Sequence, residues 1–133
     1  MRKFIAGKWL VAMLITLPLM GEPVIGSAEE LVSSGSFTGA SGHATKGDVR
    51  VLKTADGLEI VLDRNFDFDG APDPKVGFGN NGKYDIRSQL AHLKKNTGEQ
   101  RYAVPESLNI TEYNEIYIWC EAYSVPLGIA EIN

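Results

Sequence analysis

The sequence contains one cysteine, Cys120, among its 133 residues. A single cysteine excludes an internal disulfide framework and any thiolate cluster for zinc or iron–sulfur. It also excludes covalent attachment of c-type haem, which needs the motif C-x-x-C-H. Basic residues are a minority, 13 against 17 acidic residues, and the net charge is −4. Because basic side chains are what binds a phosphate backbone, we expect no nucleic-acid partner.

Long apolar runs are confined to the N-terminus. Three basic residues, Arg2, Lys3 and Lys8, precede an uncharged stretch, Trp9–Met20, which is shorter than the roughly 20 residues that cross a bilayer. Small residues then alternate in Gly26-Ser27-Ala28, a pattern typical of a signal-peptide cleavage site. We predict a signal peptide over residues 1–28, cut between Ala28 and Glu29, with an uncleaved membrane anchor as the alternative. No cysteine directly follows to carry a lipoprotein anchor, so we expect a secreted or periplasmic protein without membrane contact after cleavage.

Residues 29–133 contain short apolar runs separated by turn residues, and we predict that they form one domain. The strongest run is Glu115–Cys120, which is rich in β-branched and aromatic residues, is apolar on both faces and is therefore typical of a central strand. Asp56-Gly57 is a tight-turn dipeptide between two other runs. The pattern predicts an all-β fold, an antiparallel β-sandwich or barrel-like domain of about seven or eight short strands. The runs are 35–39, 48–52, 58–62, 76–78, 100–104, 115–120 and 123–129.

Two stretches have helical character. Ile86, Leu90 and Leu93 recur at the spacing of one helix face. Leu108–Tyr113 is long enough for a single turn, with Ser107 as its N-cap. We expect helical structure only at these two places.

Hydrolytic catalysis has little support in the motifs. The nucleophile elbow G-x-S-x-G is absent, and neither His43 nor His92 has a nucleophile beside it in the sequence. A Cys–His pair formed in space by Cys120 with either histidine stays open. A type I copper site needs a histidine and usually a methionine soon after the cysteine, and neither follows Cys120. Non-covalent haem, with the thiolate or a histidine as axial ligand, also stays open.

Asn65–Gly70 resembles the first half of a calcium-binding loop. Oxygen-bearing side chains alternate before a glycine, and Asp73 falls at the ninth position of such a loop. The twelfth position, however, is Val76 rather than a bidentate glutamate, and Pro72 occupies a position that is normally apolar. We therefore favour an Asp-rich turn and predict no metal site.

Cys120 is the best single candidate for a chemical role. Its apolar neighbours favour burial as a small hydrophobic residue, which is a common state of a free cysteine. An unpaired thiol is nevertheless unusual in an exported protein, because oxidising compartments pair or modify thiols. Strand alternation places Ile116, Ile118 and Cys120 on one face, and Tyr117 and Trp119 on the other.

A set of short motifs extends over nearly all of residues 29–133. The motifs are Gly35-Ser36-Phe37, Gly42–Gly47, Ala71-Pro72-Asp73, Leu90–Lys94, Asn96–Tyr102 with Pro105, Tyr117–Cys120 and Tyr123–Ala130. Together they resemble the electron-transfer DM-thirteen domain family, and the blocks G-x-Q-x-Y and I-W-C are the most specific. Ala71 stands where the family usually has glycine and Leu127 where an aromatic residue is common; neither departure touches the cysteine.

The resemblance implies an all-β domain of extracytoplasmic redox systems, often found beside haem-binding modules. The family's cysteine, matched here by Cys120, is proposed to act as a naked thiol or as a ligand to a prosthetic group such as haem. A redox partner protein or a haem-binding module is therefore implied, and the cofactor itself is left open. Because a buried thiol becomes reactive beside a cation or metal, we expect His43, in its glycine-rich loop, to lie near Cys120 and to share in cofactor binding.

Three functions therefore compete. The leading hypothesis is an exported electron-transfer or redox module that uses Cys120 and is not itself a classical enzyme. The alternative is an extracytoplasmic β-sandwich binding module, in which Cys120 is purely structural and the loop 67–73 contacts a partner or calcium. A thiol-dependent enzyme is the third.

Overall fold

The computed structural model describes residues 12, 14–18, 21 and 28–133. Most of the predicted signal peptide, including its small-residue cleavage pattern up to position 27, lies outside the described residues. No helix within the described part of the chain is long and apolar enough to cross a membrane.

The described domain consists of short strands, with two single-turn 3-10 helices between them. Eight of the strands form one antiparallel sheet in the order β7-β6-β10-β11-β1-β3-β4-β9, and β8 pairs with β6 off this path. A separate two-stranded sheet pairs β2 with β5. In chain order the elements are β1 (Glu30–Gly39), β2 (Thr45–Lys46), β3 (Asp48–Thr54), β4 (Gly57–Leu62), β5 (Asp67–Phe68), β6 (Pro74–Asn80), β7 (Lys83–Tyr84), η1 (Ile86–Ser88), β8 (Ala91–His92), β9 (Gln100–Ala103), η2 (Ile110–Glu112), β10 (Glu115–Cys120) and β11 (Val125–Glu131).

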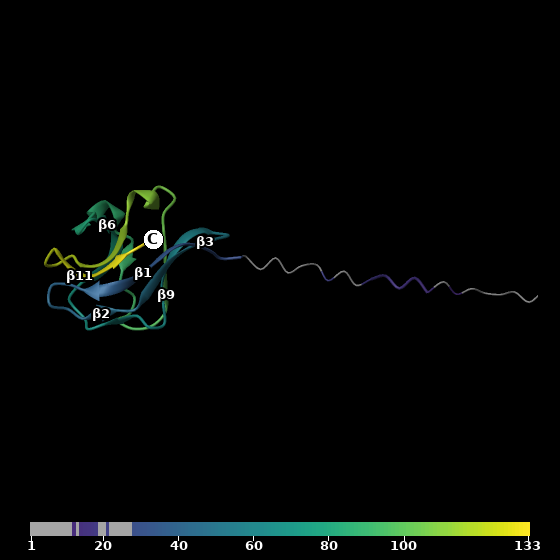
Figure 1. Ribbon diagram of the computed structural model, residues 1–133, viewed down its shortest axis with the longest axis horizontal. Coiled ribbons are helices and arrows are strands. Elements are labelled where there is room, and N and C mark those ends of the chain that lie inside the picture. Colours follow the sequence, from purple (N-terminus) through teal and green to yellow (C-terminus); the bar gives the residue numbers. More distant parts are fainter. Residues whose placement is uncertain (1–11, 13, 19–20, 22–27) are drawn as a thin grey trace, which may run out of the picture.

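The long strand β1 joins the two halves of the sheet. Its first part pairs with β3, whereas its last three residues, Phe37–Gly39, pair with β11. The sheet therefore curls on itself into a half-barrel (Figure 1). The all-β prediction is confirmed. Of the two predicted forms, a β-sandwich or a barrel-like domain, the barrel-like one matches the curled sheet.

The expected strand pattern corresponds closely to the observed elements. β10 lies between β6 and β11, as expected of a central strand. The hairpin around Asp56 is also confirmed, since β3 and β4 pair up to Thr54 and Gly57. The last strand begins at Val125 rather than Tyr123, because residues 121–124 form the turn that reverses the chain after β10.

The core fills the inside of the curled sheet. Alternation along each strand sends every second side chain inward, and in β10 these are Ile116, Ile118 and Cys120, all essentially without solvent exposure. The other strands and loops add apolar side chains to the same cluster. These include Phe37, Val49, Val51, Ile60, Leu62, Phe66, Phe68, Val76, Phe78, Tyr102 and Leu127.

Both stretches with helical character form single 3-10 turns, as predicted for the second stretch, whereas the helical face from Ile86 to Leu93 is not formed. Asp85 caps η1, and the Ser88 hydroxyl then bonds to both the N–H and the carbonyl of Phe78. Those bonds tie the chain back to β6, where it continues as β8 instead of a helix. In the second stretch Asn109 caps η2, so Ser107 as the expected N-cap is wrong.

Candidate functional site

Cys120 is the last residue of β10 and lies inside the half-barrel. Its backbone stands opposite Pro74 of β6 and Val125 of β11. The residue is 1% exposed and belongs to the core cluster. The thiol is therefore shielded from solvent in the folded domain.

One polar contact defines the environment of the sulfur. The Cys120 thiol donates a hydrogen bond to the backbone carbonyl oxygen of Pro72, with Sγ and the oxygen 3.2 Å apart. A carbonyl oxygen only accepts, so this contact requires the protonated thiol. Within residues 28–133 no hydrogen bond or ion pair brings a cationic side chain to the sulfur.

Pro72 belongs to a segment, residues 69–73, that connects β5 to β6; we call it the 69–73 loop. At its first residue, Asp69 accepts hydrogen bonds from the Ala44 N–H (3.0 Å) and from His43 Nδ1 (2.9 Å). Both hydrogen bonds hold the pKa of Asp69 below its ordinary value, and the bond from the Ala44 backbone has the larger effect. At its last residue, Asp73 Oδ1 lies 3.2 Å from Lys75 Nζ. Both ends of the loop are thus anchored.

His43 lies at the opposite end of this loop from Cys120. Its imidazole is 28% exposed, pairs with Asp69 and lies 5.9 Å from the Phe68 ring, centroid to centroid. Among the described residues, no hydrogen bond or ion pair links His43 to the sulfur. The 69–73 loop connects the two predicted site residues through hydrogen bonds at Asp69 and Pro72.

The second histidine belongs to a polar cluster on the outer side of β6. Lys75 Nζ lies 2.6 Å from His92 Nε2, 3.2 Å from Asp73 and 3.3 Å from Glu121. Because an ammonium group only donates, we assign Nε2 of His92 as the acceptor and place its proton on Nδ1. Burial lowers the pKa of Lys75, but the bonds to Asp73 and Glu121 outweigh burial and raise it above its ordinary value. The cluster fixes the 69–73 loop on the side nearest Cys120.

Sequence reasoning did not find Lys75 or the Pro72 carbonyl. Lys75 is 8% exposed although its side chain is charged. A single lysine inside an apolar strand, between Pro74 and Val76, is the signal that would have marked it. No sequence signal distinguishes the Pro72 carbonyl, because every residue carries one.

Two residues of the calcium-like segment 65–70, Asn65 and Asp69, use their side-chain oxygens within the protein. Asn65 exchanges hydrogen bonds with Asp48, accepting from its N–H and donating to its carboxylate. Asp69 is occupied by His43 and Ala44. Among the described residues, no group of three or more His, Cys, Asp or Glu side chains is arranged to hold a metal ion.

We expect calcium removal to leave the stability of the protein unchanged, because the side-chain oxygens of Asn65 and Asp69 already have partners and position twelve lacks a carboxylate. Thermal unfolding with and without a chelator measures this. A melting temperature lowered by several degrees in chelator would show a bound ion, since a ligand of the native state stabilises it by mass action.

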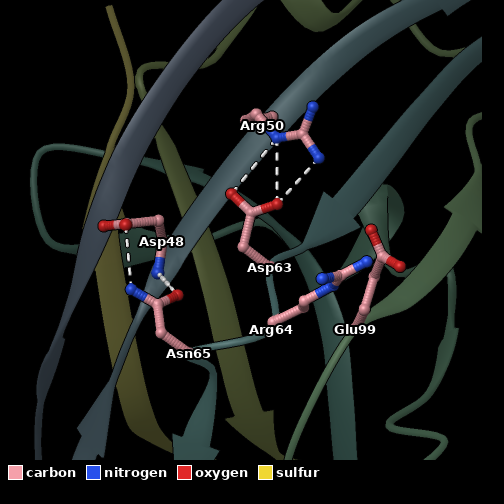
Figure 2. Close-up of a pocket in the computed structure, with 6 residues that line it drawn as sticks. All are labelled: Asp48, Arg50, Asp63, Arg64, Asn65 and Glu99. Carbon is pink, nitrogen blue, oxygen red and sulfur yellow. Dashed lines mark hydrogen bonds and ion pairs between the residues drawn. The ribbon is translucent and has the colours of Figure 1, made fainter.

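A charged pocket of about 470 Å³ lies away from the thiol, beside β3 and the end of β4. Figure 2 shows Arg50 joined to Asp63 by three hydrogen bonds, and Asp48 paired with Asn65. Asp63 raises the pKa of Arg50 above its ordinary value. Arg64 and Glu99 complete the lining. Neither Cys120 nor His43 lines this pocket.

The surroundings of Cys120 do not fit a haem as the domain is folded. Four surface cavities have volumes between about 160 and 470 Å³, and none is lined by Cys120, His43 or His92. Core side chains and the 69–73 loop fill the space around the sulfur. A macrocycle bound to Sγ would require the loop and part of the core to move.

The described domain is a small half-barrel with one thiol buried beneath the 69–73 loop. The family model for electron transfer DM13 matches residues 36–132. The chain therefore belongs to the electron transfer DM13 family, whose description assigns electron transfer to the domain, and an electron-transfer domain works with a redox partner. No curated protein and no solved structure matches the chain.

Proposed function

We propose that this protein is an exported electron-transfer module in which the Cys120 thiol is the redox group. One observation carries the proposal beyond the family assignment. The thiol, the sole sulfur of residues 28–133, is 1% exposed and is bonded to the Pro72 carbonyl of the 69–73 loop. We infer that displacement of this loop gives a partner access to the sulfur while the strands of the sheet stay paired.

The naked thiol is favoured over a haem ligand because of the packing. One-electron oxidation of the thiol by the oxidised metal centre of a redox partner breaks the S–H bond and leaves a thiyl radical, and the metal centre is reduced by one electron. The Pro72 carbonyl is too weak a base to keep the released proton. The 69–73 loop would therefore open for the proton to reach water, while the electron passes to the partner. The hydrogen bonds accepted by Asp69 and the ion pair of Asp73 with Lys75 hold the loop closed at rest.

A binding module with a structural cysteine is the second candidate. The 1% exposure of Cys120 and its neutral partner favour it, because an inert core thiol has this environment. Neither histidine contacts the sulfur, so we propose no thiol-dependent enzyme. Exchange of Cys120 for serine separates the two candidates, since only the redox proposal expects electron transfer to be lost.

Export and processing are the second part of the proposal. Strand β1 starts at Glu30, directly after the predicted cleavage point, and the Glu29 carboxylate pairs with Arg101 at 2.7 Å. The intact mass of the exported protein is expected to correspond to a chain that starts at Glu29. Recovery of the full-length chain in the membrane fraction would contradict this.

A further inference from the structure

The outer face of β10 carries a chain of aromatic rings that the thiol does not touch. Trp119, half-buried, stacks on Tyr84 with ring centroids 4.4 Å apart and planes 14° apart. Tyr84 in turn lies 5.5 Å from the ring of Tyr117, which is fully buried. The three rings therefore form a continuous path from the rim of the domain to its interior.

Two glycines of β6 make room for these rings. A Cβ atom at Gly77 would lie 2.6 Å from the Tyr84 hydroxyl oxygen, and one at Gly79 would lie 2.6 Å from Tyr117 Cε2. The rings of Tyr84 and Tyr117 thus pack directly against the backbone of β6, and a side chain at Gly77 or Gly79 would displace them. The close ring contacts depend on this choice of residues.

A carboxylate stands at the inner end of the path. The Tyr117 hydroxyl donates to Glu115 Oε1 at 3.4 Å, a long hydrogen bond that must shorten for a proton to cross. The same oxygen accepts the Gly82 N–H at 2.7 Å. Glu115 is 6% exposed and lines a cavity of about 450 Å³ on the surface with Glu131 and Thr38. A proton on Glu115 therefore has a route to water.

The environment of Tyr117 keeps its phenol protonated. Burial, together with the negative charge of Glu115, raises the pKa of Tyr117 to about 12. Burial and the charges of Glu121 and Asp85 also raise the pKa of Tyr84. The negative charges of Glu121 and Asp85 also stabilise the positive charge that an aromatic ring carries when it has lost an electron. Oxidation of Tyr117 must thus be accompanied by transfer of its proton to a neighbouring base.

Two other tyrosines of the protein, Tyr102 and Tyr113, serve as controls for Tyr117, because each lacks either a good proton acceptor or contact with the Tyr84–Trp119 rings. Tyr102, also buried, donates to Gln100 at the same spacing of two residues, but an amide oxygen is a poor proton acceptor. Tyr113 donates to the carboxylate of Asp85 at 2.7 Å. Arg87 and Tyr113 lower the pKa of Asp85 to about 2, which makes it a weak base. The ring of Tyr113 stacks on Phe78 and not on the tryptophan path.

We propose that Tyr117 is a second redox group, which passes one electron through Tyr84 and Trp119 to the oxidised metal centre of a redox partner. The phenolic O–H bond breaks, its proton forms an O–H bond with Glu115, and the metal centre is reduced by one electron. A neutral phenoxyl radical and a neutral carboxylic acid remain, and reduction reverses the step. The inference rests on the electron-transfer role of the family and not on the chemistry of Cys120.

The test uses the full chain and a photogenerated ruthenium(III) tris-bipyridine oxidant, with radicals detected by electron paramagnetic resonance. All samples carry Tyr123→Phe, because Tyr123 is 70% exposed and would be oxidised directly. The parent is expected to give a tyrosyl signal that disappears in Tyr117→Phe and persists in Tyr102→Phe and Tyr113→Phe. Glu115→Gln is expected to lose the signal, and Trp119→Phe to slow its appearance.

An undiminished signal in Tyr117→Phe, or in a folded Glu115→Gln, would overturn the proposal. Trp119→Phe provides the independent check if Glu115→Gln does not fold, because Trp119 is half-buried and lies away from the proton acceptor. An unchanged rate in that variant would overturn the electron path. Repetition in Cys120→Ser separates this inference from the proposed function, since the signal is expected to persist there and its loss would contradict the path.

Discussion

Cys120→Ser is expected to abolish electron transfer from the full chain to soluble ferricyanide while leaving the fold intact. Serine keeps a hydroxyl donor for the Pro72 carbonyl, so the bond at the end of β10 is retained. Oxygen at this position does not undergo thiol oxidation and is a far weaker ligand for soft metals. We expect a loss of about 1 kcal/mol in the free energy of unfolding, the scale of one altered buried hydrogen bond.

Two further variants make this result interpretable. Cys120→Ala removes the thiol and its hydrogen bond, costs on the order of 1 kcal/mol by lost burial, and is expected to be equally inactive. Val76→Ala opens the same wall of the core, since Val76 stands opposite Ile118 of β10, yet leaves the sulfur in place. It is expected to retain electron transfer. Full activity in both Cys120 variants would favour the binding module with a structural cysteine.

Gly79→Ala is expected to destabilise the domain by about 3 kcal/mol, the upper end of what overpacking a rigid site costs. The added Cβ would collide with the Lys83 carbonyl oxygen and lie 2.6 Å from Tyr117 Cε2. The carbonyl belongs to a paired strand and the ring is fully buried, so neither can move freely. For a domain of this size the melting temperature is expected to fall by more than about 10 °C.

Gly82→Ala is the matched control for that substitution. A Cβ at Gly82 would meet nothing within 4 Å, but the backbone there has φ +82°. Its cost is therefore backbone strain alone, about 1 kcal/mol. Urea unfolding of the two variants compares them directly. Equal losses of stability would contradict the close packing of β6 against the Tyr117 ring.

The strands were predictable because their signal is local. In β10 the alternation of Ile116, Tyr117, Ile118, Trp119 and Cys120 fixes which side chains enter the core, and the structure confirms both faces. The position of β10 between two other strands follows from apolar residues on both faces. Alternating patterns predict strands reliably because a sheet with one buried face requires apolar side chains at every second position.

The segment after Asp85 shows where local patterns fail. Ile86, Leu90 and Leu93 have helical spacing, yet Ile86 is 58% exposed while Leu93 joins the core. The hydrogen bonds between Ser88 and Phe78 decide the path of the chain, and a partner ten residues away leaves no periodic trace. Propensity was overridden by tertiary contacts.

The candidate site was predictable only where it depends on local sequence patterns. Cys120 was identified from its strand and from the family motif, which the family match over residues 36–132 supports. The contacts of Lys75 with His92, and of Tyr84 with Trp119, join segments of the chain whose proximity depends on how β6, β7 and β8 pair. Their geometry exists only in the folded sheet.

Protein-film voltammetry of the full chain tests the central claim, that Cys120 is the redox group, most directly. The wild-type protein and Val76→Ala are predicted to give the same wave from the thiol, and Cys120→Ser is predicted to lack that wave, whatever wave Tyr117 gives at its own potential. A wave of the same height and potential in folded Cys120→Ser would contradict the account.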